Sequence, residues 1–307
     1  MTNVNNKKVL ILGSTGTLGK SFRKYWSCAA DVFYGVRGNP QEPNEIIFDM
    51  KQSTFSMREC LAKFDIVINC AAITQVDVIE SNPVKESESK EINWKAVERL
   101  ADACLATETT LIHFSTDYVF GNNWQRPYCE DDMGSGTTNK YGFHKWCAED
   151  YIKKSGCNYM IFRVSWLFSE ESGNFLYTLF DKMHRTNETV YGVTDIISSP
   201  TYTKDIVDMV CTIISTNQEN KIGVYHFTNE GVCTRYDFIA KVSNYVPKCP
   251  FDKIVAVDNS YFNPAARRPA CSVMSKTKIK CVFGLNIRDW ATALDECCHK
   301  IINNYYK

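Results

Sequence analysis

Near its start the chain reads Val9-Leu10-Ile11-Leu12-Gly13-Ser14-Thr15-Gly16-Thr17-Leu18-Gly19. An apolar run, a Gly/Ser/Thr turn and a helical pattern over residues 20–26 predict a strand, a tight turn and a helix. Two residues separate successive glycines, so the spacing departs from the commoner fingerprint and the strand–turn–helix context carries the prediction. Glycines allow close backbone approach, and free N–H groups at a helix N-terminus favour an anion. This opening therefore predicts a site for a dinucleotide pyrophosphate.

Apolar runs alternate with helical patterns through the first half of the chain. The runs cover residues 9–12, 31–36, 46–48, 66–70, 110–115 and 159–164. The helical patterns cover residues 57–63, 86–105 and 139–152. This alternation predicts an α/β fold with a doubly wound parallel sheet of the Rossmann type. Ligands in such sheets bind at the carboxyl ends of the strands.

The second half of the chain is less regular. Helical patterns cover residues 173–185, 236–245 and 289–302, and residues 224–227 resemble a strand. We therefore expect a dinucleotide-binding domain over residues 1–165 and a smaller C-terminal α/β substrate lobe over residues 166–307. Segments of the second half could also pack back against the first domain.

Composition narrows the classes of partner. The 307 residues include 44% apolar and 13% aromatic residues, enough for a sizeable core. The 35 basic residues balance the 35 acidic ones, so no global field favours nucleic acid or an anionic membrane. We expect small molecules as partners, with any anion bound locally.

Targeting and metal signals are weak. Residues 1–8 are polar, and no run approaches the roughly 20 apolar residues of a membrane span. The 14 cysteines are scattered without a Cys-x-x-Cys pair, which favours reduced thiols and a cytoplasmic location. Cys297, Cys298 and His299 are adjacent on a predicted helix and point in different directions, so no metal site is expected.

Three polar residues form a candidate catalytic set. Tyr141 and Lys145 lie one helical turn apart and can share one face, and Thr116 follows a predicted strand. In a chain with 16 tyrosines a Tyr-x-x-x-Lys pair is weak evidence on its own. Spacing alone favours the simpler interpretation, in which Lys145 is a solvated helix charge and Thr116 an ordinary strand-end residue.

Further blocks carry a family resemblance. The sequence resembles the extended short-chain dehydrogenase/reductases and, within them, the dTDP-4-dehydrorhamnose reductase family. The blocks run in family order along nearly the whole chain and comprise residues 69–77, 114–120, 141–145, 163–166, 173–175, 199–201 and 267–269. His144 departs from the small residue usual before the lysine, and Val164 from the commoner threonine.

The resemblance implies a reaction. It is the NADPH-dependent reduction of the 4-keto group of a nucleotide-linked 4-keto-6-deoxy sugar, giving dTDP- or UDP-L-rhamnose or a related deoxysugar, with NADH as the alternative cofactor. Thr116, Tyr141 and Lys145 would be catalytic, with Tyr141 as the proton donor. We expect a Lys145 ammonium about 4 Å away to lower the Tyr141 pKa by about three units, toward 7. Lys145 would also bind the nicotinamide ribose.

The resemblance also implies the cofactor contacts. They fall mostly at the turns after successive strands, at Gly13, Thr15, Gly16, Thr17, Leu18, Gly19, Arg37, Asp49, Met50, Cys70, Ala71, Ala72, Thr74, Tyr141 and Lys145. Arg37 ends the second predicted strand, where no carboxylate is present. A basic residue there accepts a 2′-phosphate, which favours NADPH.

Substrate contacts are likewise implied by the resemblance. Tyr118, Trp166 and Asn174 would line the sugar pocket, with Val76 behind it. Arg267 or its neighbour Arg268 would bind the nucleotide diphosphate, since guanidinium groups pair well with phosphates.

Two other functions and the assembly stay open at this point. One alternative is a bifunctional 3,5-epimerase/4-reductase of UDP-rhamnose synthesis, which needs a further acid/base pair. The other is a non-catalytic regulatory subunit like that of methionine adenosyltransferase, which resembles the same family. A homodimer is possible in each case.

Overall fold

A seven-stranded sheet forms the centre of the computed structural model, which describes residues 7–122, 125–132, 136–186, 188–246 and 253–305. Residues 1–6 of the polar N-terminal stretch lie outside the described residues. Every neighbouring pair in the sheet is parallel. In spatial order the strands are β11 (Gly223–His226), β6 (Tyr159–Val164), β5 (Thr110–Thr116), β4 (Ile66–Asn69), β1 (Lys8–Leu12), β2 (Asp31–Val36) and β3 (Glu45–Ile47).

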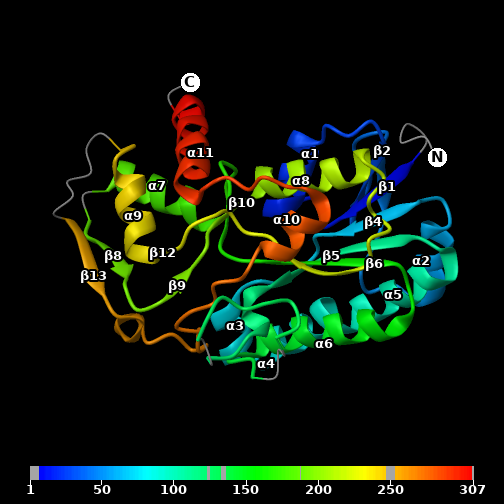
Figure 1. Cartoon of the computed structure of the whole chain (residues 1–307), viewed down its shortest axis with the longest axis horizontal. Helices are drawn as coiled ribbons and strands as arrows, with labels where there is room; N and C mark the ends of the chain where they lie inside the picture. The colour runs from blue at the N-terminus through cyan, green and yellow to red at the C-terminus, as the bar shows by residue number, and fades with distance from the viewer. Residues whose placement is uncertain (1–6, 123–124, 133–135, 187, 247–252, 306–307) are drawn as a thin grey trace.

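Helices cover both faces of this sheet (Figure 1). On one face, buried side chains of the strands pack against α1 (Thr17–Tyr25), α8 (Thr203–Ser215) and α10 (Thr277–Phe283). On the other face they pack against α2 (Thr54–Leu61), α5 (Ala96–Thr107) and α6 (Lys140–Ser155). Successive β1 residues alternate between the two cores, as the period of a strand requires. The predicted doubly wound α/β fold is therefore confirmed.

A second, smaller core lies beside the sheet. It joins short strand pairs to three helices and is lined by Phe168, Phe180, Phe238 and Leu294 among others. Its elements are β7 (Leu167–Phe168), α7 (Phe175–Arg185), β8 (Val190–Val193), β9 (Ile197–Ser198), β10 (Thr201–Tyr202), β12 (Cys233–Thr234), α9 (Arg235–Ser243), β13 (Ile254–Val257) and α11 (Trp290–Tyr305). The strand pairs are β10–β7, β12–β9 and β13–β8.

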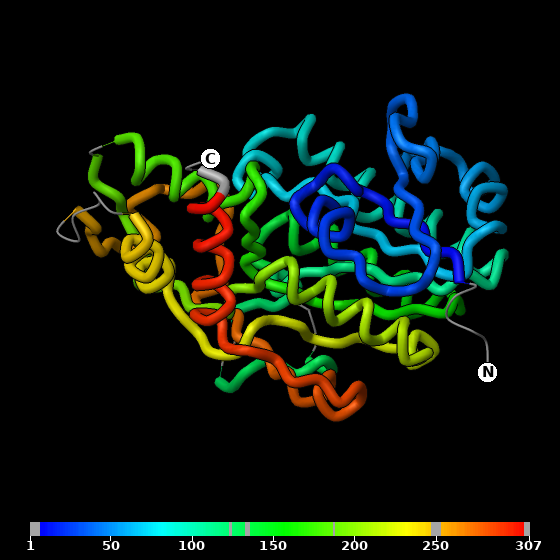
Figure 2. The backbone as a smooth tube through the Cα atoms, turned by 90° about the horizontal axis from the view of Figure 1, so that it is seen from above, coloured from blue at the N-terminus to red at the C-terminus, as the bar shows by residue number. Residues whose placement is uncertain are grey.

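Parts of the second half of the chain return to the central sheet. β11 pairs with β6, and α8 packs in the same core as α1. Seen from above, α11 lies at the junction between the smaller core and the sheet layer (Figure 2). Its Lys300 donates to the Tyr25 hydroxyl of α1 at 3.1 Å and to the Tyr202 hydroxyl of β10 at 3.3 Å. These contacts tie the two cores together.

The long helix expected over residues 86–105 is divided in the structure. It comprises α4 (Pro83–Lys90), a π-helical turn at Glu91–Lys95, and α5. The π turn carries the buried Asn93, whose amide accepts from Ile73 N at 2.9 Å and donates to Ile73 O at 2.8 Å. The irregular turn thus anchors the loop between β4 and α3 (Val76–Ser81), and π turns are often found at functional sites.

Side-chain caps determine where two of the helices begin. Ser53 caps α2 by accepting from Ser56 N, so this helix begins at Thr54 rather than at residue 57. Asn139 caps α6 by accepting from Gly142 N at 2.9 Å. A Cβ on Gly142 would lie 2.1 Å from Tyr118 O, so only glycine allows α6 to reach the turn after β5. That contact brings Tyr141 next to Thr116.

The turn after β1 packs tightly against itself and against the turn after β4. Gly13 has a φ of +72°, and a Cβ there would lie 2.6 Å from Ala71 N. A Cβ on Gly19 would lie 2.2 Å from Gly13 O and 2.6 Å from the Cα of Ser14. Because the obstructing atoms are backbone, a side chain at either position forces the turn apart.

No helix in the described ranges is long and apolar enough to cross a membrane.

Gly19→Ala should lower the free energy of unfolding by about 2–3 kcal/mol, the upper range for overpacking against atoms that cannot move. Gly38→Ala is the matched control, because a Cβ there meets nothing within 4 Å. Urea unfolding of both variants measures the difference. Equal midpoints for the two variants would contradict the tight packing of the turn.

Candidate active site

The predicted cofactor residues gather at one edge of the sheet. Residues 13–19 follow β1, Arg37 follows β2, Asp49 and Met50 follow β3, and residues 70–74 follow β4. These four strands are neighbours in the order β4, β1, β2, β3, so their carboxyl ends meet at this edge. Arg37 and Asp49 are exposed, whereas the Met50 side chain is buried.

The start of α1 is open to an anion. Gly16 is its N-cap and provides no side-chain acceptor for the first-turn N–H groups. Thr15 and Gly16 are exposed at the tip of the turn. Unpaired N–H groups and the helix dipole together favour a phosphate at such a position.

Thr116 and Tyr141 are in direct contact at the end of β5. The Thr116 hydroxyl lies close enough to the Tyr141 phenol to affect its pKa, donates to Asp117 Oδ1 at 3.2 Å and accepts from Tyr118 N at 3.2 Å. The Tyr118 and Tyr141 rings meet edge to face, with centroids 6.2 Å apart. The structure therefore brings Thr116, Tyr118 and Tyr141 together at the carboxyl end of β5.

Lys145 is buried against β5, with 2% of its surface exposed. Its Nζ donates to Phe114 O at 2.7 Å and lies 3.0 Å from His113 Nε2. Burial lowers the Lys145 pKa to about 8. The alternative of a solvated helix charge is wrong for this lysine.

The expected effect of Lys145 on Tyr141 is absent from the structure. The pKa of Tyr141 is raised, first by burial of the phenol and then by the negative charge of Asp117. Lys145 is instead directed into the sheet, where it bonds Phe114 and His113. The predicted lowering of the tyrosine pKa toward 7 is therefore wrong for the protein without a bound cofactor.

Asp117 is a buried acid next to the reacting pair that the sequence did not single out. Its carboxylate accepts from the hydroxyls of Ser165 at 2.7 Å, Ser198 at 3.4 Å and Ser272 at 2.5 Å. Burial raises its pKa despite these donors. The serines come from segments far apart in the chain, so no local pattern predicts the cluster.

A cavity of about 540 Å³ opens beside Tyr118 and Trp166. The remaining lining residues come mainly from the smaller core and comprise Asp77, Phe175, Tyr191, Val193, Ile196, Arg235, Ile239, Asn259, Phe262, Asn263, Pro264, Ala265 and Arg268. The wall is largely apolar and aromatic, with two guanidinium groups, which suits a ligand with a ring and an anionic part.

Arg235 is the main cavity residue that sequence reasoning missed. Its guanidinium carbon lies 3.8 Å from the centroid of the Trp166 ring and 4.6 Å from that of Phe175. No carboxylate in the described part of the chain forms an ion pair with it. A guanidinium held by aromatic rings keeps its hydrogen-bond donors available for an anion.

Three predicted substrate residues lie elsewhere. Asn174 is the N-cap of α7, where its amide accepts from Leu176 N and donates to Ser169 O. Val76 and Asn174 are both absent from the cavity wall. Arg267 is exposed and its carbonyl accepts from Asn139, whereas Arg268 lines the cavity and pairs with Asp77 at 2.5 Å. Of the two arginines, Arg268 is therefore the one that faces the cavity.

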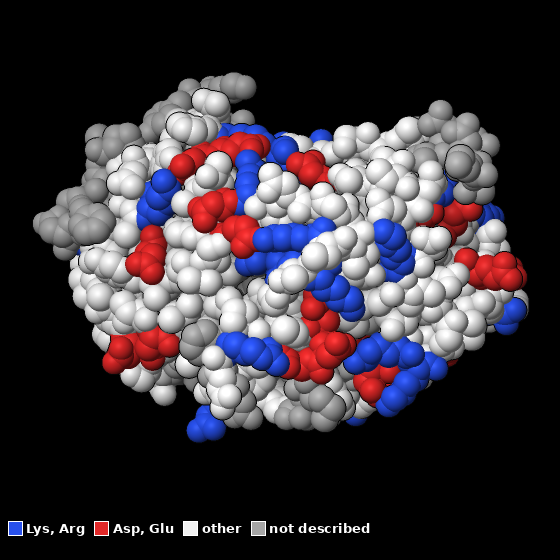
Figure 3. All heavy atoms as spheres, viewed as in Figure 1, with Lys and Arg blue, Asp and Glu red and all other residues white. Residues whose placement is uncertain are grey.

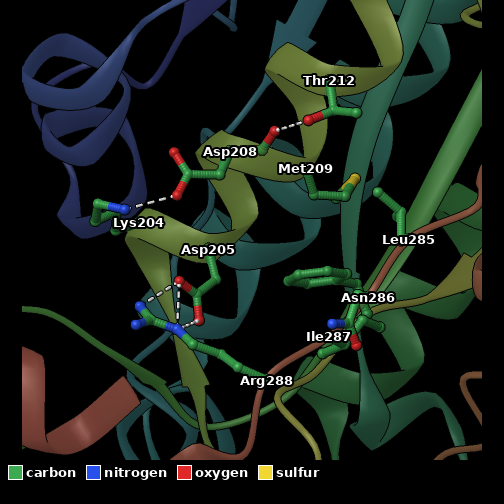
Figure 4. A pocket seen from close by; sticks show the side chains of 10 residues that line it. Lys204, Asp205, Asp208, Met209, Thr212, Leu285, Asn286, Ile287 and Arg288 are labelled. Atoms are coloured by element: carbon green, nitrogen blue, oxygen red, sulfur yellow. Dashed lines mark hydrogen bonds and ion pairs between the residues drawn. The ribbon is translucent and has the colours of Figure 1, made fainter. Parts of the chain in front are cut away.

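A second pocket, the surface charges and the Cys297–His299 cluster are weaker candidates for a functional site. A pocket beside α8 is lined by charges that already pair with each other, Asp205 with Arg288 and Lys204 with Asp208 (Figure 4). Basic and acidic side chains are interspersed over the face seen in Figure 3, without a single-sign field. Cys297 and Cys298 are buried while His299 is exposed, and no metal-binding group of three such ligands occurs within the described ranges.

The sheet, the glycine turn and the Thr116–Tyr141–Lys145 set define a short-chain dehydrogenase/reductase of the extended type. A family model described as RmlD substrate binding domain matches residues 7–303. The dTDP-4-dehydrorhamnose reductase of Aggregatibacter actinomycetemcomitans is 30% identical over 94% of this chain and 97% of that protein. The Burkholderia thailandensis enzyme of the same name is 29% identical over 96% and 99%.

A solved structure agrees with these relatives. The dTDP-4-dehydrorhamnose reductase of Bacillus anthracis, in complex with NADP, superposes with a TM-score of 0.84 and 26% identity over 96% of this chain and 99% of that one. The chain belongs to the RmlD family, that of the dTDP-4-dehydrorhamnose reductases.

The Tyr141 phenol should remain protonated up to at least about pH 10, the ordinary phenol value, because burial and Asp117 both disfavour its anion. Ultraviolet titration of the cofactor-free protein and of Tyr141→Phe measures this. A tyrosinate that forms near pH 7 and is lost in the variant would contradict the structure.

Proposed function

We propose that this protein reduces the 4-keto group of a nucleotide-linked 4-keto-6-deoxy sugar with NADPH, as a dTDP-4-dehydrorhamnose reductase. The observation that carries the proposal is the position of the Thr116–Tyr141 pair: Thr116 ends β5 at the same edge of the sheet as the open start of α1, and Tyr141 contacts Tyr118, which lines the arginine-bearing cavity. One side of this pair suits a dinucleotide and the other a sugar nucleotide. The family relatives named above carry the same activity in their names.

The residues at the sheet edge fit a dinucleotide. The uncapped start of α1 offers N–H groups to a pyrophosphate, and Gly13 and Gly19 leave no room for side chains there. Arg37 is exposed at the tip of β2, where it would bind a 2′-phosphate. Asp49, Met50 and residues 70–74 would border the adenosine and nicotinamide portions. The bound cofactor supplies the hydride.

Tyr141 would donate the proton. When a ketone becomes an alkoxide, its oxygen gains negative charge and needs a donor. A phenol whose pKa is raised is still a far stronger acid than an alcohol, and at neutral pH it holds the proton it must give. Thr116 would orient the phenol and share the hydrogen bond to the sugar oxygen. Lys145 would bind the nicotinamide ribose.

The cavity would hold the sugar nucleotide. Tyr118, which contacts Tyr141, and Trp166 both line the cavity and would contact the sugar. Arg235 and Arg268 would neutralise the diphosphate, the role that the resemblance gives to Arg267 or Arg268. Asn174 would act indirectly, by fixing the start of α7 and hence Phe175 beneath Arg235.

The regulatory alternative requires neither a buried tyrosine–threonine pair nor this cavity, and the epimerase alternative requires a second acid/base pair. A cytoplasmic location and a homodimer stay predictions.

The purified chain should consume NADPH when given a dTDP-4-keto-6-deoxy sugar, with the UDP-linked sugar as a second substrate to compare. Tyr141→Phe should lower kcat at least about a hundredfold with cofactor affinity nearly unchanged. Near-wild-type turnover in the variant would refute the assignment of Tyr141. Binding of NADPH without turnover, together with a stable complex with methionine adenosyltransferase, would favour the regulatory alternative.

Arg37→Ala should weaken NADPH binding about tenfold or more and leave NADH binding nearly unchanged, because only NADPH offers a 2′-phosphate. Arg58→Ala, on the exposed surface of α2, is the control for loss of one positive charge. Calorimetric titration with each cofactor checks the difference. Equal losses for NADPH and NADH would show that Arg37 does not read the phosphate.

A further inference from the structure

Three buried polar side chains form a chain of hydrogen bonds beneath the candidate active site. Asn69, His113 and Lys145 are 1%, 0% and 2% exposed, respectively. Asn69 Nδ2 lies 3.2 Å from His113 Nδ1, and His113 Nε2 lies 3.0 Å from Lys145 Nζ.

The direction of these hydrogen bonds is determined at one end. Ala71 N–H can only donate, and it lies 3.0 Å from Asn69 Oδ1. The Asn69 amide is therefore oriented with its oxygen toward Ala71 and its Nδ2 toward His113. Because Nδ2 is also only a donor, His113 Nδ1 must accept.

The orientation of Asn69 also determines which ring nitrogen of His113 carries the hydrogen, and hence how His113 bonds Lys145. Burial lowers the His113 pKa well below its ordinary value, so the ring is neutral and carries one N–H. With Nδ1 accepting, that hydrogen is on Nε2 and is directed at Lys145 Nζ. An amine nitrogen accepts a hydrogen bond only when it is uncharged, and Nζ in turn donates to Phe114 O at 2.7 Å.

We propose that Asn69 and His113 are positioning residues that donate into the Lys145 amine and thereby set the pH at which this lysine becomes charged. The importance of this effect for catalysis rests on the function proposed above. The hydrogen bonds that run from Asn69 through His113 to Lys145, here called the relay, are a property of the free protein. Burial of Lys145 also lowers its pKa, so burial and the hydrogen bond from His113 act in the same direction.

Protonation of Lys145 would reverse the direction of the hydrogen bonds from Asn69 to Lys145. An ammonium must donate to His113 Nε2, so the ring hydrogen moves to Nδ1 and faces the Asn69 amide. Asn69 must then turn its oxygen to His113, which leaves Ala71 N–H facing a second donor. Ala71 packs directly on the Gly13 turn, so the charge on Lys145 is coupled to the loop that would hold the cofactor.

The other groups around Lys145 are few. Glu149, one turn further along α6, raises its pKa, as does the Cys70 thiol after β4, and both effects are smaller than that of burial. Glu149 is already paired with Arg163 at 2.7 Å. His113 on β5 is therefore the residue whose side chain forms a direct hydrogen bond with Lys145 Nζ.

The relay can be tested in the full-length protein without substrate. Lysine labelled with ¹³C at Cε reports the titration of each amine by NMR, and Lys145→Arg assigns the Lys145 signal. We expect a midpoint at or below about 8, against about 10.4 for an ordinary lysine. His113→Gln, whose amide oxygen is free to accept from an ammonium, should raise the midpoint by about one pH unit, the scale of one hydrogen bond to a charge.

A second variant and a control separate this effect from damage to the fold. Asn69→Ser can still accept from Ala71 N through its hydroxyl but no longer reaches His113, so it should also raise the Lys145 midpoint. His226→Gln changes another fully buried histidine, bonded to Arg163 on the neighbouring strand, and should leave the midpoint unchanged.

An ordinary lysine midpoint in the wild type, or an unchanged midpoint in both His113→Gln and Asn69→Ser, would overturn the proposal. Because no substrate is present, these outcomes are independent of the proposed reductase activity.

Discussion

The backbone contact between the Gly13 turn and Ala71 determines the geometry of the whole site. It places the open start of α1 directly beside the loop after β4. That loop is held from the other side by Asn93 on the π turn and by Asn69 at the end of β4. Through Asn69 and His113 it is connected to Lys145, and hence to the helix that carries Tyr141. The glycine turn, the loop after β4 and α6 are therefore joined by a continuous series of contacts.

Burial of charge is the second constraint, and it explains the acid–base character of the site. Unpaired buried charges are costly, so each ionisable group here shifts toward its neutral form or is surrounded by donors. Tyr141 keeps its proton, Lys145 loses its proton more readily, and Asp117 is held by serine hydroxyls. The Tyr141 phenol, which we propose as the proton donor, therefore keeps its proton at neutral pH.

Much of the sheet layer could be predicted from the sequence because continuous apolar runs and glycine turns are local signals. The strands at residues 31–36 and 159–164 match β2 and β6 at both ends. The return of β11 to β6 could not be predicted, because pairing partners depend on long-range packing. The division of residues 86–105 by a π turn depends on the contact of Asn93 with Ile73, which is also non-local.

Within the site, sequence and resemblance identified the residues at strand ends better than those on the smaller core. Thr116 and Tyr141 do meet, because both lie in regular elements of the sheet layer. Arg235 was missed because its position depends on stacking with Trp166 and Phe175. Asn174 was predicted to contact the substrate, but its amide caps α7. Lys145 was predicted to act on Tyr141, but its amine bonds β5.

Transfer of a labelled hydride tests the central claim most directly. The protein is given a dTDP-4-keto-6-deoxy sugar and NADPH that carries deuterium on carbon 4 of the nicotinamide, and the product is examined by NMR. The account predicts one deuterium on carbon 4 of the sugar. Consumption of NADPH without deuterium at that carbon would contradict it.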